Sequence, residues 1–162
     1  MKAAPPSASR PHQALVQLLR AADTVWAASR AFFARWDLSP SQFNVLNLLE
    51  GNPSGLSQTE LGRQLIMHRS NVTGLVDRLE KRGLVKREDA AGDRRAYRVM
   101  LTPGGGRLLG EVLPRYFEGV GRVCGHLSER RAVELIADFR QIARNAERIA
   151  AGLAHAEHRR RH

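Results

Sequence analysis

Apolar residues recur every three or four positions in three long stretches of the chain, which is the spacing of amphipathic helices. The first stretch predicts a helix over residues 12–36, the second a helix that begins at Pro103, and the third a helix that begins near Ser128. Pro114 interrupts the second of these helices, where we expect a kink. The three helices belong to the two ends of the chain and leave residues 38–102 between them.

The central stretch predicts two shorter helices from their capping residues. Ser39 is placed to cap a helix N-terminus, with Pro40 in the first turn, and the turn-forming residues 51–55 end this helix. Ser57 and Glu60 have the spacing of a capping box, in which each side chain satisfies a backbone amide at the helix start. A second short helix is therefore expected to begin directly after Ser57.

A third helix and a β-hairpin complete the central stretch. After a turn at residues 66–68, a helix is expected from Arg69 to Gly83, a residue that suits a left-handed helix end. The hairpin would consist of a strand (84–87), a charged loop (88–94) and a return strand (95–101). The predicted fold class is mainly α with a small β-hairpin wing, a winged helix-turn-helix with flanking dimerisation helices.

The helix that begins at Arg69 carries short hydrogen-bonding side chains on its first surface positions. Such side chains suit the edges of bases in a DNA major groove, and the positive end of a helix favours phosphate. The expected contacts are Arg69, Ser70, Asn71 and Thr73. An ordinary amphipathic helix with a polar face would show the same pattern, so this helix alone favours DNA only slightly.

The predicted hairpin tip strengthens the DNA interpretation. Arg94 and Arg95 follow Asp93 in a charged loop, and an arginine at a hairpin tip can enter the narrow and strongly negative minor groove. Asp93 can hold a guanidinium group there by a bidentate ion pair. The strands add three basic residues that are expected to contact phosphate and position the protein on the duplex: Lys86, Arg87 and Arg98.

In the order of these elements and in its motifs, the chain resembles the multiple-antibiotic-resistance regulator (MarR) family of winged-helix repressors. The resemblance extends from Leu38 to Leu109. Its most specific segments are VT (72–73), LVDRLE (75–80), GLV (83–85), and Asp93-x-Arg95 followed by Leu101-Thr102. The flanking helices fit the layout of the family but contain no diagnostic motif.

The resemblance implies a homodimer that binds a pseudo-palindromic DNA duplex. It makes Arg95 the wing arginine and Asp93 its acidic partner, and it assigns DNA contacts to the same four positions of the recognition helix, the helix that begins at Arg69. Two features depart from the family. His68 stands where a Ser or Thr usually caps the recognition helix, and the glycines at 104–106 are expected to soften the joint between the wing and the next helix.

The apolar stripes of the terminal helices also favour a homodimer. The central module is predicted to be compact without them, so a stripe with no partner in its own chain requires another chain. Packing of these helices on each other is the alternative. The predicted organisation is a flexible N-terminal lead (1–11), a helical dimerisation arm (12–37 and 103–152), a winged helix-turn-helix DNA-binding domain (38–102) and a basic C-terminal tail (153–162).

The composition agrees with double-stranded DNA as a partner. The chain of 162 residues has 26 Lys and Arg against 16 Asp and Glu, a net charge of +10 that suits a polyanion. This excess is spread along the chain, since residues 38–102 contain ten basic and seven acidic residues. One cysteine, Cys124, excludes an internal disulfide and favours a reducing bacterial cytoplasm, and no apolar run is long enough for a membrane span.

Two further features could bind or sense small molecules. The resemblance implies a pocket for a small aromatic or lipophilic effector, which Trp26, Arg30, Phe33 and Trp36 could line, although the three aromatic residues are more typical of core or dimer contacts. Cys124 could sense oxidants, with an idle thiol as the more ordinary interpretation.

No motif in the chain predicts catalysis, a cofactor or a metal site. The histidines lack the spacing of metal ligands, and the glycines at 104–106 lack the lysine of a phosphate-binding loop. We therefore predict a transcriptional regulator, by default a ligand-responsive repressor, rather than an enzyme. The alternatives are a winged helix that binds nucleic acid without sequence specificity, a redox regulator acting through Cys124, and a small enzyme with an acidic substrate.

Overall fold

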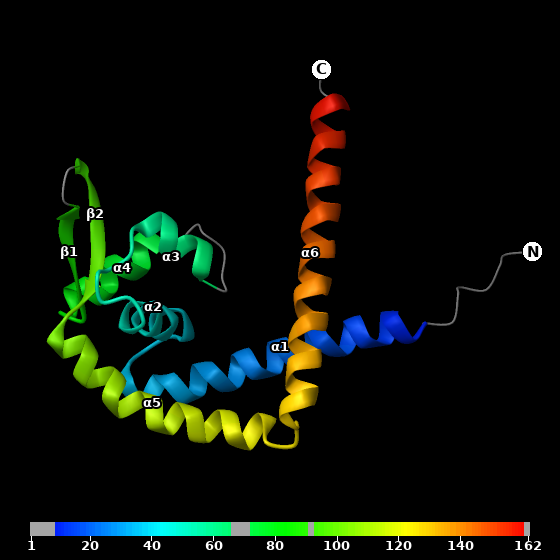
Figure 1. Cartoon of the computed structure of the whole chain (residues 1–162), viewed down its shortest axis with the longest axis horizontal. Helices are drawn as coiled ribbons and strands as arrows, with labels where there is room; N and C mark the ends of the chain where they lie inside the picture. Colours follow the sequence, from blue (N-terminus) through cyan, green and yellow to red (C-terminus); the bar gives the residue numbers. More distant parts are fainter. Residues whose placement is uncertain (1–8, 66–71, 91–92, 161–162) are drawn as a thin grey trace, which may run out of the picture. The chain divides into compact units, whose positions relative to one another are not determined.

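A computed structural model describes residues 9–65, 72–90 and 93–160. In chain order the elements are α1 (Arg10–Phe33), the short 3-10 helix η1 (Ala34–Trp36), α2 (Pro40–Glu50), α3 (Gln58–Gln64), α4 (Val72–Lys81), β1 (Val85–Ala90), β2 (Asp93–Leu101), α5 (Pro103–Cys124) and α6 (Glu129–Arg160). Most described residues are helical, and the two strands form one antiparallel hairpin (Figure 1), which confirms the predicted class. The chain divides into two compact units, residues 1–113 and 114–162, which are described separately.

The first helix begins earlier than the sequence predicted. The Ser9 hydroxyl accepts a hydrogen bond from the backbone amide of His12 at 3.4 Å, and Pro11 lies in the first turn. Both features are helix-start signals, so α1 includes Arg10 and Pro11, which had been assigned to the flexible lead. After η1, Asp37 adopts a left-handed conformation with φ 51°, and the chain turns into α2.

The next two helix starts have the predicted caps. At α3, the Ser57 amide donates to a Glu60 carboxylate oxygen at 2.7 Å, and the Glu60 amide donates to the Ser57 hydroxyl at 3.2 Å, which confirms the capping box. At α2, Ser39 is the predicted cap, and Gln42 completes a second capping box by accepting from the Ser39 amide at 2.8 Å. This role of Gln42 was not predicted from the sequence.

Helix α4 ends where the sequence predicted. Gly83 has φ 67°, a left-handed conformation that costs glycine little, and the Leu84 amide then donates to the Leu79 carbonyl at 3.0 Å. The predicted turn at residues 66–68 and the predicted helix start at Arg69 lie outside the described residues.

The hairpin strands are longer than predicted. The expected loop over residues 88–94 is wrong at most of its positions, because β1 continues to Ala90 and β2 begins at Asp93. In the register, Glu88 lies opposite Arg98, but the Glu88 carboxylate pairs with Lys86 on its own strand and the Arg98 guanidinium contacts the segment before α3. A solvent-exposed hairpin has no buried face that requires alternating apolar residues. Hydrophobic periodicity therefore did not identify residues 88–90 and 93–94 as strand.

Unit 1 buries a core shared by the helices and the base of the hairpin. Helix α2 contacts α3, α4 and β2, and α4 contacts β1 (Figure 1). The buried apolar side chains are Phe33, Leu38, Phe43, Val45, Leu46, Leu49, Leu56, Leu61, Val72, Leu75, Val76, Leu79, Leu84, Val85, Val99, Leu109 and Val112. An isolated antiparallel bridge between Leu56 and Val99 joins the segment before α3 to the free side of β2. The recognition helix and the wing are therefore anchored in one core.

The start of α5 is packed tightly against the hairpin base. Thr102 donates to the Gly83 carbonyl at 2.6 Å and accepts from the Gly105 amide at 3.1 Å. Gly105 is buried, and a Cβ atom there would lie 2.2 Å from the Leu84 carbonyl oxygen. Gly105 is therefore required for the close approach of α5 to the Leu84 backbone. The joint between the wing and α5 is tight, and not softened as the glycines at 104–106 had led us to expect.

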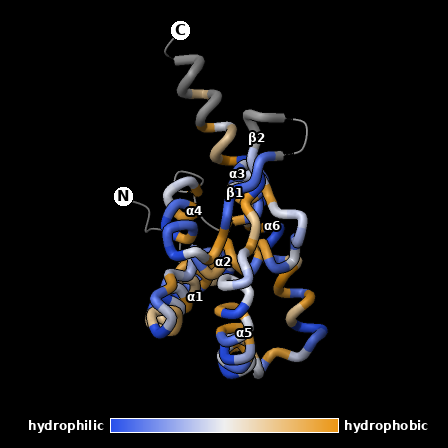
Figure 2. The backbone as a smooth tube through the Cα atoms, turned by 90° about the vertical axis from the view of Figure 1, so that its left-hand side faces the viewer, coloured by the Kyte–Doolittle hydropathy of each residue, from blue (hydrophilic) through white to orange (hydrophobic). Residues whose placement is uncertain are grey.

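Unit 2 contains the end of α5 and all of α6. Helix α5 continues through Pro114, and α6 extends to Arg160, into the stretch that had been predicted as a tail from residue 153. The residues at the end of α6 are mainly Ala, Leu, Glu and Arg, which are strong helix formers. Apolar segments recur along α5 and α6 in the hydropathy-coloured trace (Figure 2). No helix among the described residues is both long and apolar enough to cross a membrane.

Candidate nucleic-acid interface

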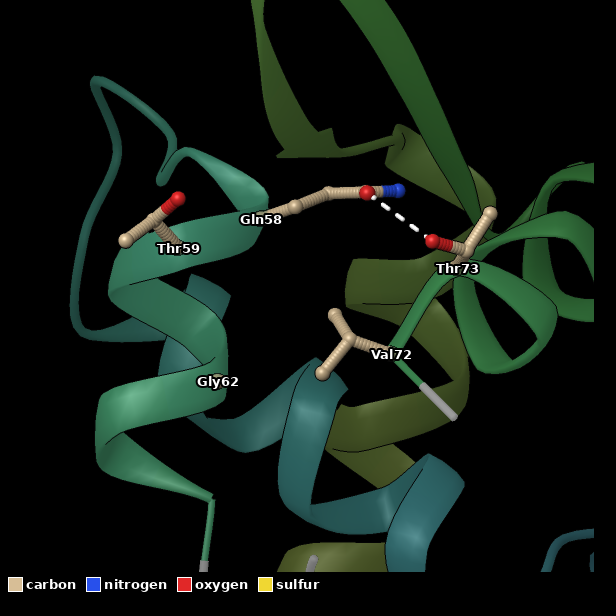
Figure 3. Close-up of a pocket in the computed structure, with 5 residues that line it drawn as sticks. All are labelled: Gln58, Thr59, Gly62, Val72 and Thr73. Carbon is tan, nitrogen blue, oxygen red and sulfur yellow. Dashed lines mark hydrogen bonds between the residues drawn. The ribbon is translucent and has the colours of Figure 1, made fainter. Parts of the chain in front are cut away.

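Thr73 lies in the first turn of α4 and is exposed, as a DNA-contacting residue must be. Its hydroxyl donates a hydrogen bond to Oε1 of Gln58, at the start of α3, over 3.1 Å (Figure 3). The other three residues expected on this helix, Arg69, Ser70 and Asn71, lie outside the described residues. One of the four predicted positions can therefore be placed, and it carries a hydrogen bond that the sequence analysis missed.

A pocket of about 280 Å³ lies between α3 and α4 (Figure 3). Its lining residues are Gln58, Thr59, Gly62, Val72 and Thr73. The Nε2 atom of Gln58 is buried and has no hydrogen-bond partner within the part of the chain that the structure describes. Among the described residues, the side-chain amide of Gln58 therefore has a hydrogen-bond partner for its oxygen but not for its nitrogen.

Arg87 of β1 joins the hairpin to α4. Its Nη2 atom lies 2.5 Å from Oδ1 of Asp77, its Nη1 atom pairs with Glu80, and its backbone amide donates to Glu80 at 3.0 Å. Its guanidinium carbon lies 5.3 Å from the centre of the Tyr97 ring, within the range of a cation–π contact. We call these four residues the Arg87 clamp.

The clamp keeps Arg87 charged although it is largely covered. Burial by itself acts to lower the pKa of Arg87, but hydrogen bonds to Asp77 and Tyr97 and the charge of Glu80 raise it above its usual range. A fixed positive charge held by two carboxylates on successive turns ties the strand to the helix. The clamp therefore sets the position of the wing relative to the recognition helix.

Arg98 on β2 makes a second connection, to the segment before α3. Its Nε atom donates to the Ser54 carbonyl at 2.8 Å, and its Nη2 atom donates to the Gly55 carbonyl. The Nη2 atom also lies 3.9 Å from Oε2 of Glu60. The pKa of Glu60 is lowered by the hydrogen bonds from the Ser57 amide and hydroxyl, with smaller contributions from Arg98 and Arg63. The cap of α3 is therefore linked to the wing.

The three basic strand residues that were expected at phosphate differ in their availability. Arg87 and Arg98 are engaged within the protein, as described above. Lys86 is half exposed and pairs with Glu88 on the same strand. In this protomer, Lys86 is the freest of the three to contact a phosphate.

The predicted wing residues occupy the start of β2. Asp93, Arg94 and Arg95 are the first three residues of that strand, and Asp93 is paired with Ala90 across the hairpin. The backbone thus places all three at the tip of the wing, as expected, although in strand rather than in loop.

The residues expected at an effector pocket lie along the end of α1 and in η1. Phe33 is buried and stacks on Phe43 with ring centres 4.3 Å apart, so it belongs to the core. Trp36 is half-buried, 5.3 Å from the Phe32 ring. The remaining two predicted residues are Trp26, which is half-buried, and Arg30, which is exposed. An effector pocket at these positions stays a prediction.

Other expected features can be placed as well. Cys124 is exposed at the end of α5. Within the described residues, no group of three His, Cys, Asp or Glu side chains is arranged to hold a metal ion. Arg82, which the sequence analysis did not single out, donates to the Trp36 carbonyl at 3.1 Å and to the Asp37 carbonyl. It ties the end of α4 to the segment before α2.

Three contacts were not predicted from the sequence: Gln58 with Thr73, and Asp77 and Glu80 with Arg87. A signal existed for the two carboxylates, since a spacing of three residues places them on one helix face. No local signal pointed to Gln58, because its partner is fifteen residues away along the chain.

Comparison with known proteins agrees with this architecture. The model of the MarR family matches residues 36–96. The transcriptional repressor YetL of Bacillus subtilis is 32% identical over 112 residues, which cover 67% of this chain and 67% of YetL. Two further transcriptional regulators, PecS of Dickeya dadantii and YfiV of Bacillus subtilis, are 30% and 38% identical, and the matches cover 64% and 57% of their lengths. The chain thus matches less than two thirds of these two relatives.

Solved structures show the same fold. The structure of CouR from Rhodococcus jostii RHA1 bound to p-coumaroyl-CoA is similar with a TM-score of 0.75 at 26% identity, covering 85% of this chain and 96% of CouR. The structure of MepR from S. aureus in complex with DNA is similar with a TM-score of 0.72 at 20% identity, covering 81% of this chain and 96% of MepR. At the latter identity the likeness shows the fold alone.

Proposed function

Because this chain belongs to the MarR family of transcriptional regulators, we propose that it is a sequence-specific DNA-binding regulator that acts as a homodimer on a pseudo-palindromic operator. The observation that carries the proposal is the Arg87 clamp. It fixes α4, with Thr73 exposed in its first turn, to a hairpin whose backbone carries Arg94 and Arg95 near its tip. A helix and a wing held in one geometry can enter adjacent grooves of a duplex together.

In the proposed complex each protomer uses two elements. The start of the recognition helix, with Arg69, Ser70, Asn71 and Thr73, would contact base edges in the major groove. The wing, with Arg94 and Arg95 beside Asp93, would enter the minor groove.

The basic residues of the strands would have different roles. Lys86 would contact phosphate. Arg87 and Arg98 would act mainly by positioning the wing, since their guanidinium groups are engaged within the protomer.

A homodimer is supported by the apolar residues that α1, α5 and α6 leave exposed. These residues are Leu15, Leu19, Val25, Phe117, Val120, Val123, Val133, Ile136, Phe139, Ile142, Ile149 and Leu153. A monomer with this many exposed large apolar side chains on three helices would be poorly soluble, and burial against a second copy removes the cost. Two-fold symmetry would then set half-sites about 10 base pairs apart or at a multiple of that distance.

We propose repression as the default activity, with release by a small ligand. CouR, at 26% identity, was solved with p-coumaroyl-CoA bound, and the YetL relative is a repressor. A ligand that prefers one spacing of the two recognition helices would shift the dimer between binding and non-binding states. The aromatic residues Trp26 and Trp36 support an aromatic or lipophilic effector. A regulator of this kind acts in the cytoplasm, without catalysing a reaction.

The proposal is tested by selecting binding sites from a pool of random duplexes and footprinting the protein on the selected sequence. We expect protection of a short pseudo-palindrome. We also expect log affinity to fall steeply with log salt concentration, because several phosphates are neutralised. A footprint without sequence preference would favour the non-specific nucleic-acid-binding module instead, and an affinity that does not change with salt would contradict DNA binding altogether.

A further inference from the structure

We infer that Gln58 is a positioning residue that makes Thr73 a hydrogen-bond acceptor toward DNA, so that the regulator selects a base with an amino group in the major groove at the position that Thr73 contacts. The inference rests on the proposed function, since it concerns how that DNA interface reads sequence. It adds a residue outside the recognition helix to the determinants of specificity, and it names the class of base that is recognised.

Thr73 uses its single hydroxyl proton within the protein. The threonine hydroxyl has one proton to donate and two lone pairs to accept with. In the structure it donates that proton to Oε1 of Gln58 at 3.1 Å, while the side chain remains exposed at the start of α4 (Figure 3). What the hydroxyl can still offer to a ligand is therefore its lone pairs.

The surroundings of Gln58 indicate why a glutamine occupies this position. Gln58 is half-buried, and its Nε2 atom is buried with no hydrogen-bond partner among the residues described. Buried polar atoms without partners are rare in native proteins. An apolar side chain of similar length would fill the same space without that unpaired donor, so packing alone does not account for the glutamine. The hydrogen bond from Thr73 to Gln58 accounts for it.

The four bases differ in the hydrogen-bonding groups that they present in the major groove. In the major groove, adenine N6 and cytosine N4 present donors, whereas guanine N7 and O6 and thymine O4 present only acceptors. A hydroxyl that has already given its proton to Gln58 can accept from adenine or cytosine but has nothing to donate to guanine or thymine. Thr73 should therefore favour an amino-bearing base at one position of each half-site.

The experiment compares selected binding sites for the wild-type dimer, three single variants and the double variant Gln58→Met with Thr73→Val. Thr73→Val keeps the shape of the side chain but removes the hydroxyl. Gln58→Met fills the same space without an acceptor, and Gln58→Glu supplies an acceptor that cannot donate. Each variant is first checked for its fold by circular dichroism and for its dimeric state by sedimentation, so that a change in base preference can be read separately from misfolding.

We expect the wild type to prefer adenine or cytosine at one symmetric pair of positions, by about 3- to 10-fold over guanine or thymine. Thr73→Val should remove this preference. Gln58→Met should relax it because the hydroxyl can then donate as well as accept, and the double variant should behave as Thr73→Val does. Gln58→Glu should keep the preference while binding every sequence more weakly, because of its added negative charge near DNA.

Three results would overturn the inference. In the first, Gln58→Met weakens binding equally for all sequences and keeps the wild-type preference, as a purely structural glutamine would. In the second, Gln58→Glu loses the preference although its carboxylate can only accept, which would mean that the preference does not come from a Thr73 hydroxyl whose proton is taken by residue 58. In the third, the wild type selects no sequence at all, and this result would also end the proposed function, whereas the first two would leave it intact.

Discussion

Arg87 on β1 and Asp77 on α4 form an ion pair, with Nη2 of the arginine 2.5 Å from Oδ1 of the aspartate. Glu80, one turn further along α4, holds the other side of the same guanidinium group. The pair connects the element proposed to enter the major groove with the element proposed to enter the minor groove. Rigid placement of two groove-binding elements reduces the conformational entropy lost on binding, so the pair should matter for affinity as well as for stability.

Replacing Arg87 by methionine should destabilise the winged helix. The side chains of Arg87, Asp77 and Glu80 are 22%, 48% and 37% exposed. We expect a loss of roughly 1–2 kcal/mol, between the values typical of exposed and of buried ion pairs. Urea unfolding of the wild type and the variant measures this loss of unfolding free energy. Lys86→Met is the matched control, because among the described residues Lys86 pairs with exposed Glu88 alone, and its replacement should cost about 0.5 kcal/mol or less. Equal losses for the two variants would show that the Arg87 clamp stabilises the winged helix no more than an exposed ion pair does.

Replacing Arg95 by alanine should weaken specific DNA binding. If the wing enters the minor groove, the loss should be roughly 1–3 kcal/mol at the selected operator. A titration of labelled operator gives the affinity. Arg130→Ala removes an exposed charge of α6 that pairs with Glu134, and it should leave the affinity nearly unchanged. Affinity within twofold of wild type for Arg95→Ala would count against the wing contact.

Glu60→Gln should change how stability depends on pH. The hydrogen bonds from the Ser57 amide and hydroxyl lower the pKa of Glu60 in the folded protein below its ordinary value of 4.5. A lowered folded-state pKa adds stability that is present above that ordinary value and is lost as pH falls through the folded-state pKa. The wild type should therefore exceed the variant in stability at pH 7 by more than it does in acid. Urea unfolding at both pH values tests this, and a constant difference would refute it.

Two neighbouring glycines should respond to alanine with opposite signs. At Gly105 a Cβ atom would lie 2.2 Å from the Leu84 carbonyl oxygen, so Gly105→Ala should destabilise the protein by about 1–3 kcal/mol through overpacking. At Gly106 the nearest atom, from Leu101, is 4.0 Å away. Gly106→Ala should therefore stabilise the helix, by roughly 0.5–1 kcal/mol. Thermal unfolding of both variants checks the contrast, and two changes of the same sign would contradict it.

Phe139→Asp should weaken dimerisation. Phe139 is exposed on α6 among several other large apolar residues, and a charge placed in a buried interface is costly. We expect the variant to sediment as a monomer at concentrations where the wild type is a dimer, and to lose operator affinity with it. Gln141→Asp adds the same charge at a polar position of the same helix and should remain dimeric. A wild type that is monomeric at all concentrations would rule out the proposed assembly.

The order and type of the elements could be predicted because local chemistry determines them. The capping box at Ser57 and Glu60 and the left-handed residue Gly83 are local signals, and each has the predicted geometry. Element ends were less predictable. Periodicity cannot identify an outer strand segment such as Glu88 to Ala90, because a solvent-exposed ribbon has no buried face to produce an alternating pattern.

Contacts between distant parts of the chain were the least predictable aspect of the candidate site. Arg87 and Arg98 were expected to face phosphate because they are basic residues on the wing, yet the fold places carboxylates and carbonyls within their reach. The Gln58–Thr73 hydrogen bond depends likewise on how α3 crosses α4. Which charges remain for a partner can be known only after the charges used inside the protein are identified.

The bridge between Leu56 and Val99 pairs the second side of β2 at Val99, whereas within the described residues no bridge covers the outer side of β1. Open strands are templates on which other molecules can add their own strands and aggregate. Four of the six residues of β1, Lys86 to Asp89, are charged, and charge on such a strand opposes that addition. The same residues that shape the wing thus protect the protein from self-association through it, even where many copies crowd together.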